Sequence, residues 1–171
     1  MIDVKVGNEI NLNSIIEHLK TLGGGNQADN EKRLSAFSHF YELKLNRDDF
    51  ESLVFLKNGT LSELVDPKNR SLGKTAKNAI ELIDAGKGNL GANWDLNTVE
   101  RNFTTTLGVN PVNLNGIVLR DASSGEKTHA GAKFYLQDGC HRSLGYMIHI
   151  LRTNDTYTDQ IALVATNTAL C

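Results

Sequence analysis

The sequence predicts an α+β fold, with a helical N-terminal region over residues 1–91 followed by a small mixed domain over residues 95–171. Apolar residues recur at helical spacing before Trp94, whereas short apolar runs typical of strands alternate with amphipathic stretches after it. The chain has 171 residues, of which 40% are hydrophobic and 22% charged, and it contains only two prolines. That composition is typical of a folded chain of about one domain.

The first region is expected to hold four helices, because its apolar residues fall three and four positions apart. Asn13 or Ser14 is suited to cap the first helix, and the glycines at 23–25 are expected to end it. Gly86 is expected to follow the end of the fourth helix as a C-cap. The other three helices are expected over residues 34–43, 48–56 and 72–85.

The second region is expected to alternate between helix and strand. Asp95 or Asn97 can cap a helix that Gly108 ends, and Pro111 then opens an extended stretch. From His141 onward, apolar residues recur at the spacing of one helix face, so a further helix is expected there. Strands are expected over residues 112–119, 133–137 and 160–166, with a polar loop over residues 121–131.

Charge and cysteine content exclude several classes of protein. The 18 Lys and Arg against 20 Asp and Glu give a net charge of -2, which does not suit non-specific coating of nucleic acid. Cys140 and Cys171 are too few for a disulfide framework or a four-ligand zinc site. Residues 1–12 lack the basic and apolar parts of a signal peptide, and no run approaches the about 20 apolar residues that span a bilayer. We therefore expect a cytoplasmic protein that makes no membrane contact, and export by a machine that reads no cleavable signal stays open.

Reactive side chains are densest over residues 134–143, at the expected junction of a strand and a helix. Such a junction binds anions, because the first N–H groups of a helix lack internal acceptors and the helix dipole adds positive charge. Gly139 lets the backbone approach a phosphate, Arg142 supplies a forked charged donor, and His141 can donate or act as an acid or base. Ser143 completes the candidate phosphate site. The alternative interpretation is tight packing at the strand end, with His141 and Arg142 simply exposed.

Two neighbouring residues are candidates for chemistry beside His141. Cys140 begins the expected helix next to two groups that can be cationic, where the pKa of a thiol is usually lowered, so it is a candidate nucleophile. A small buried hydrophobic residue is the alternative for Cys140. Asp138 is a candidate base or Mg²⁺ ligand, whereas a turn-forming role before Gly139 is the plainer explanation.

The order of a strand, Asp138-Gly139-Cys140-His141-Arg142 and an amphipathic helix resembles the signature of the ParB/sulfiredoxin superfamily. The sulfiredoxin branch has Gly-Gly-Cys-His-Arg, so Asp138 replaces its first glycine, and the ParB-like branch commonly has Asp-Gly-X-His-Arg. The resemblance covers roughly residues 95–166. It implies binding of a nucleotide, ATP or CTP with Mg²⁺, through residues 139–142.

The same resemblance implies nucleotide-dependent phosphoryl transfer or hydrolysis. It further implies that polar residues of the preceding helix contact the nucleotide, and Arg101, Thr104 and Thr105 are the candidates by position. A divergent sulfiredoxin is an alternative, in which the thiolate of Cys140 attacks a phosphorylated sulfinic acid on a protein acceptor.

A non-catalytic DNA-binding or host-interaction protein that reuses the fold is the other alternative. Residues 1–91, which have no counterpart in the resemblance, would then form the recognition surface. This stretch has a modest group of basic residues, which is more typical of ordinary solvated surface than of a nucleic-acid contact. The group consists of Lys68, Arg70, Lys74 and Lys77.

Overall fold

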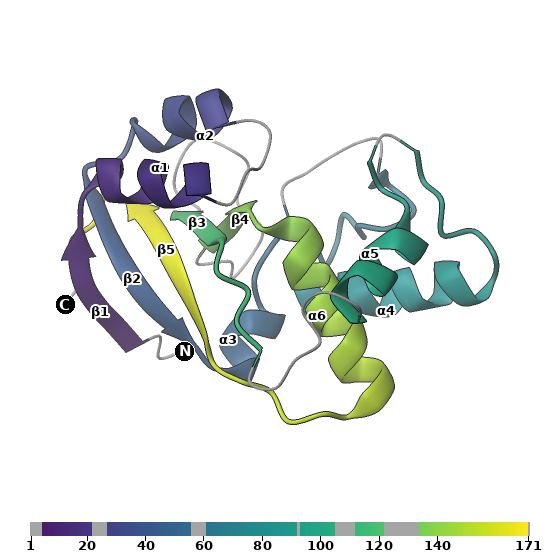
Figure 1. Cartoon of the computed structure of the whole chain (residues 1–171). Helices are drawn as coiled ribbons and strands as arrows, with labels where there is room; N and C mark the ends of the chain where they lie inside the picture. Colours follow the sequence, from purple (N-terminus) through teal and green to yellow (C-terminus); the bar gives the residue numbers. More distant parts are fainter. Residues whose placement is uncertain are drawn as a thin grey trace.

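The computed structural model describes residues 5–21, 27–55, 61–91, 93–104, 112–121 and 134–170. Helices and a mixed five-stranded sheet are both present, which confirms the α+β prediction (Figure 1). The strands are β1 (Lys5–Ile10), β2 (His39–Leu45), β3 (Ile117–Asp121), β4 (Phe134–Asp138) and β5 (Gln160–Thr166). The helices are α1 (Leu12–Thr21), α2 (Gln27–Leu34), α3 (Arg47–Glu51), α4 (Leu72–Asp84), α5 (Leu96–Asn102) and α6 (Cys140–Thr153).

The strands lie in the order β1-β2-β5-β3-β4. β5 pairs antiparallel with β2 from His39 opposite Thr166 to Leu45 opposite Gln160, and it pairs parallel with β3 on its other side. The outer pairs, β1 with β2 and β3 with β4, are antiparallel. Strands from both halves of the sequence therefore form one sheet, with β5 at its centre.

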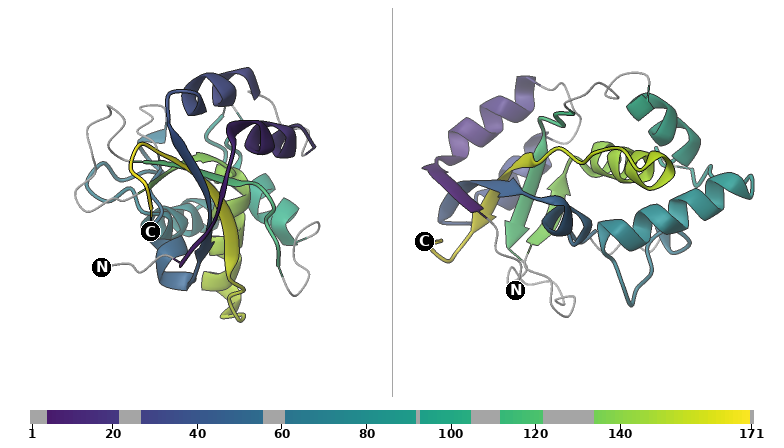
Figure 2. Two further views of the ribbon diagram at one scale, coloured as in Figure 1. Left: turned by 90° about the vertical axis from the view of Figure 1, so that its left-hand side faces the viewer. Right: turned by 90° about the horizontal axis from the view of Figure 1, so that it is seen from below.

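Helices cover both faces of this sheet, with α1 and α2 on one side and α4, α5 and α6 on the other (Figures 1 and 2). Successive residues of a strand point to opposite faces, so β5 supplies Val164 to one core and Ala165 to the other. The smaller core lies under α1 and includes Ile15 and Phe40. Among the described residues, no helix is long and apolar enough to cross a membrane.

The expected helix over residues 34–43 is wrong. α2 ends at Leu34, and residues 39–45 form strand β2 instead. The side chains of Phe40 and Tyr41 are both buried, on opposite faces of the sheet. Residues 41–45 do alternate between apolar and polar, which is the period of a strand, but the adjacent apolar residues Phe40 and Tyr41 interrupt that alternation. Residues 1–91 therefore contain the two strands β1 and β2 as well as helices.

The other elements are close to the expected ones. α4 has Ser71 as its N-cap, and Gly86 adopts a left-handed φ of 72° just beyond its end. α3 is shorter than expected, because the chain is extended again by Val54, which bridges to Ser71 and Tyr135. α1 begins earlier than expected, with the side chain of Asn11 accepting from the backbone N–H of Ser14 at 2.8 Å. The expected features at residues 23–25, 108, 111 and 122–131 lie outside the described residues.

Candidate functional site

The segment with the densest reactive side chains does join a strand to a helix. β4 ends at Asp138, and α6 begins at Cys140 after a single residue, Gly139. Gly139 has a left-handed φ of 85°, and a Cβ added there would lie 2.6 Å from the carbonyl oxygen of Gly116. Glycine is therefore required at this junction. No side chain caps α6, so the N–H groups of its first turn keep their capacity to bind a ligand.

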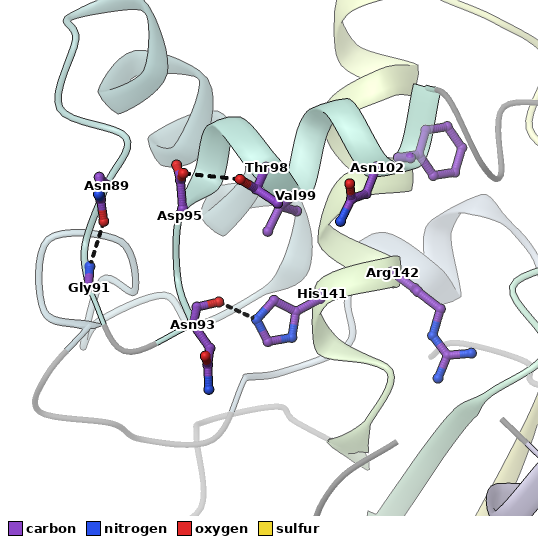
Figure 3. A pocket seen from close by; sticks show the side chains of 10 residues that line it. Asn89, Gly91, Asn93, Asp95, Thr98, Val99, Asn102, His141 and Arg142 are labelled. Atoms are coloured by element: carbon purple, nitrogen blue, oxygen red, sulfur yellow. Dashed lines mark hydrogen bonds between the residues drawn. The ribbon is translucent and has the colours of Figure 1, made fainter. Parts of the chain in front are cut away.

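A cavity of about 750 Å³ lies beside this first turn, between α5, α6 and the loop that precedes α5 (Figure 3). α6 contributes His141 and Arg142, and α5 contributes the hydroxyl of Thr98 and the amide of Asn102. Cavities of this size are typical of small-molecule sites. The full lining comprises Asn89, Gly91, Asn93, Asp95, Thr98, Val99, Asn102, Phe103, His141 and Arg142.

Arg142 brings a permanent positive charge to the cavity. One of its nitrogens, Nη1, donates to the carbonyl oxygen of Leu114 at 3.1 Å, which fixes the direction of the side chain. Within the described ranges of the chain, no carboxylate forms an ion pair with this guanidinium. Since a guanidinium has five N–H donors, most of them stay available for an anion.

His141 is held in one orientation by its neighbours. Its ring stacks on the indole of Trp94, with centroids 4.0 Å apart and planes 20° from parallel. Nε2 lies 2.9 Å from the carbonyl oxygen of Asn93, and because a carbonyl can only accept, Nε2 carries the hydrogen. In the neutral ring the lone pair is then on Nδ1, which makes Nδ1 the nitrogen able to accept a proton.

The loop that holds His141 is closed by its own backbone. The N–H of Leu90 donates to the carbonyl of Trp94, and the N–H of Trp94 donates to the carbonyl of Gly91. Asn93 adopts a left-handed φ of 72°, a conformation that asparagine tolerates better than most residues. Asp95 ends the loop as the N-cap of α5, and the Thr98 hydroxyl is the main cause that lowers the pKa of its carboxyl.

The expected low pKa of Cys140 is wrong. Its side chain packs against the larger core, with Sγ 4.0 Å from the carbonyl oxygen of Leu136, and it does not line the cavity. Burial raises the pKa of the thiol to about 12, and the nearby charge of Asp138 adds to the effect. The thiolate needed for nucleophilic attack is thus disfavoured at neutral pH.

Asp138 is turned away from the cavity, toward α2. One of its oxygens accepts from Nδ2 of Asn30 at 2.8 Å, and the other accepts from the backbone N–H of Gly139 at 2.7 Å. Asn30 also accepts from Nε2 of Gln137 at 3.0 Å. These contacts match the turn-forming role. The described part of the chain holds no cluster of three His, Cys, Asp or Glu side chains that could bind a metal ion.

The remaining candidates lie off the cavity. Ser143 is fully buried beneath the first turn, whereas Arg101 on α5 and Thr104 just after α5 are both exposed. Arg101 donates to the hydroxyl of Thr98 at 3.2 Å, so it touches the cavity only through another residue. Thr105 lies outside the described residues.

The face of α5 that lines the cavity was identifiable in principle. Its residues Asp95, Thr98, Val99 and Asn102 stand at i, i+3, i+4 and i+7, the spacing of one helix face. By contrast, nothing local in the sequence indicates the contacts of Asn93 and Trp94 with His141, which is 48 residues further along the chain.

Arg70 does not belong to a basic surface with its neighbours in sequence. It is 6% exposed, and its guanidinium lies 5.5 Å from the ring centroid of Tyr135.

Comparison of the chain with protein-family models, with curated proteins and with solved structures finds no match.

Proposed function

We propose that the cavity beside α6 binds a nucleoside triphosphate, ATP or CTP, in the cytoplasm, and supports transfer or hydrolysis of its terminal phosphate. The observation that carries the proposal is the position of His141 and Arg142, which lie side by side in the uncapped first turn of α6 and on the wall of one cavity. Backbone N–H groups, a helix dipole and a guanidinium then converge on one anion.

The opposite wall of the cavity suits the uncharged part of a nucleotide. Asn89, Asn102 and Thr98 offer amides and a hydroxyl that can both donate and accept, while Val99 and Phe103 supply apolar surface. A volume of about 750 Å³ accommodates a ligand of this size.

His141 is the residue suited to move a proton in this reaction. With Nε2 committed to the carbonyl of Asn93, Nδ1 would take the proton of an attacking hydroxyl or water as that oxygen bonds to phosphorus. The bond from phosphorus to the bridging oxygen then breaks, and the nucleoside diphosphate leaves with its charge stabilised by Arg142 and the first turn of α6. Asp95 is the carboxylate among the residues that line the cavity. A single carboxylate is too few to hold a resident Mg²⁺, but it suits an Mg²⁺ ion that is already bound to the phosphates of the nucleotide.

The two alternatives receive less support. A sulfiredoxin mechanism needs the thiolate of Cys140, and a pKa of about 12 opposes its formation. Binding of DNA through residues 68–77 would need a contiguous basic surface, and Arg70 packs on Tyr135 instead.

Calorimetric titration with ATP and with CTP in the presence of Mg²⁺ tests the proposal. We expect saturable binding to the wild-type protein, weakened about ten- to a hundredfold by Arg142→Ala, because a hydrogen bond to a charged group is lost. Arg101→Ala is the matched control, since it removes an arginine that does not line the cavity, and it should leave the affinity unchanged.

Release of phosphate then separates binding from catalysis. His141→Gln should retain nucleotide affinity within a few fold and lose turnover, because glutamine cannot accept a proton at neutral pH. A folded wild-type protein that binds neither nucleotide would overturn the assignment. Turnover that survives in His141→Gln would overturn the role of the imidazole alone.

A further inference from the structure

A second cavity, of about 400 Å³, lies on the face of the sheet that α1 covers in part. Glu42 of β2 contributes to its floor together with Ile161 and Leu163 of the neighbouring strand β5. One turn of α1, from Ser14 to His18, forms its roof. The segment that precedes β3 lies between the two cavities, because Gly116 lines the second one and the guanidinium of Arg142, which lines the first, lies against Gly116.

The carboxylate of Glu42 is the group in this cavity that favours binding of a cationic ligand. Its side chain is partly buried, and within the described part of the chain it makes no hydrogen bond and no ion pair. Lys44 lies two residues further along the same strand face, but its ammonium pairs with Asp159 at 3.4 Å. A carboxylate that is partly withdrawn from water without a partner is destabilising, so a bound cation would relieve a cost already present in the fold.

Several other polar groups of the cavity already have partners. Nε2 of His18 donates to the carbonyl oxygen of Asn115, and the hydroxyl of Ser14 donates to Oδ1 of Asn11 at 3.0 Å. Oδ1 of Asn113 accepts from the backbone N–H of Asn115 at 3.1 Å. Glu42 is the carboxylate among the residues that line this cavity, and a donor that carries positive charge suits it.

The surroundings of Glu42 are apolar. Ile161, opposite Lys44 in the register, is 52% exposed and is the large hydrophobic side chain left open to solvent among the described residues. Leu163, directly opposite Glu42, is partly buried, and Ile117 closes the floor. An aliphatic chain lying over Ile161 and Leu163 would cover this surface and remove it from water.

We propose that this second cavity binds a small primary alkylamine, with its ammonium group on Glu42 and its alkyl chain over Ile161 and Leu163. The proposal does not depend on nucleotide binding at the first cavity. A volume of about 400 Å³ is near the lower end of the range for small-molecule sites, which favours a short chain over a bulky one.

Titration of the ¹⁵N-labelled protein with pentylamine, followed by amide chemical shifts, tests the proposal. We expect saturable shifts at Glu42, Ile161 and Leu163 with dissociation constants up to about the millimolar range. Pentanol has the same chain without the charge, and pentanoate reverses the charge, so both should bind the wild-type protein at least about tenfold more weakly.

Glu42→Gln keeps the shape of the side chain and removes its charge, so it should weaken pentylamine binding about tenfold or more. Glu81→Gln is the matched control, because it removes a carboxylate from the exposed surface of α4. Three results would overturn the proposal: no saturable shift with pentylamine, equal binding of pentanol, or a folded Glu42→Gln protein that binds as the wild type does. If Glu42→Gln fails to fold, the comparison of pentylamine with pentanol binding to the wild-type protein still tests the proposal.

Discussion

The guanidinium of Arg142 occupies the space that a side chain at Gly116 would need. A Cβ added at Gly116 would lie 2.7 Å from Cζ of Arg142, well inside van der Waals contact. The same guanidinium donates to the carbonyl of Leu114, two residues earlier. The direction of this guanidinium is therefore set by the segment that leads into β3, and not by α6 alone.

Gly116→Ala should consequently reduce nucleotide affinity without unfolding the protein. The atoms that crowd the new methyl group belong to the end of a flexible side chain, which can turn aside, so the loss of stability should stay within about 1 kcal/mol. Turning aside removes the guanidinium from the phosphate site, and we expect the affinity to fall about tenfold. Calorimetry together with thermal unfolding measures both quantities. A protein with unchanged affinity would contradict the proposed position of the phosphates.

Gly139→Ala should instead destabilise the fold itself. The new methyl group would meet the backbone oxygen of Gly116 at 2.6 Å, and a backbone atom cannot turn aside as a side chain does. The left-handed φ of 85° adds its own strain, so the free energy of unfolding should fall by about 2 to 4 kcal/mol in urea titration. Gly86→Ala is the control, because Gly86 has a φ of 72° with open space around it, and it should lose only about 1 kcal/mol. Equal losses at the two positions would refute the steric argument.

Trp94→Leu should release the imidazole of His141. The stack on the indole contributes about 0.5 to 1.5 kcal/mol, and without it the ring can leave the carbonyl of Asn93. We expect ¹⁵N spectra of the imidazole to show Nε2 protonated in the wild type and a mixture of tautomers in Trp94→Leu. Trp94→Phe retains an aromatic face and should resemble the wild type. These spectra report on the ring whether or not a nucleotide binds.

The thiol of Cys140 should be nearly inert at neutral pH. A pKa of about 12 against the ordinary value of 9.0 makes its thiolate about a thousandfold scarcer, so alkylation by iodoacetamide should be slowed to that extent or more. The measurement needs a Cys171→Ser background, in which Cys140 is the remaining cysteine. Rapid alkylation of the folded protein at pH 7.5 would revive the sulfiredoxin alternative.

The same raised pKa has a consequence for stability at high pH. Above pH 9 the unfolded chain loses the thiol proton while the folded chain keeps it, so the free energy of unfolding falls as the pH rises toward 12. Cys140→Ser removes this contribution, and its stability should depend less on pH over that interval than that of the wild type. Parallel curves for the two proteins would contradict the burial of the thiol.

The elements that the sequence predicts well are those whose apolar residues form an uninterrupted pattern. α6 follows its apolar positions Leu144, Met147, Ile148 and Leu151, and β5 spans the expected residues 160–166. β2 was mistaken for helix because Phe40 and Tyr41, each buried in a different core, place two apolar residues next to each other, although residues 41–45 alternate between apolar and polar. The alternation over residues 41–45 is the signal in the sequence that indicates this strand.

The candidate site divides in a similar way. His141 and Arg142 stand together in five residues that can be interpreted locally, and both line the cavity. The groups that orient them are the backbone carbonyls of Asn93 and Leu114. Every residue has a backbone carbonyl, so the residue type at these positions gives no signal of this role. Sequence patterns can therefore indicate the side chains of such a site, but not the distant backbone atoms that fix the orientation of those side chains.

The central position of β5 has a consequence for the newly made chain. This strand is the last of the described strands to be synthesised, yet it joins β2, more than 110 residues earlier, to β3. Until residues 160–166 leave the ribosome, the two halves of the sheet have no shared strand, and β1 with β2 is only an isolated pair of strands. The mature sheet must then form by contacts between distant parts of the chain, and such contacts slow folding.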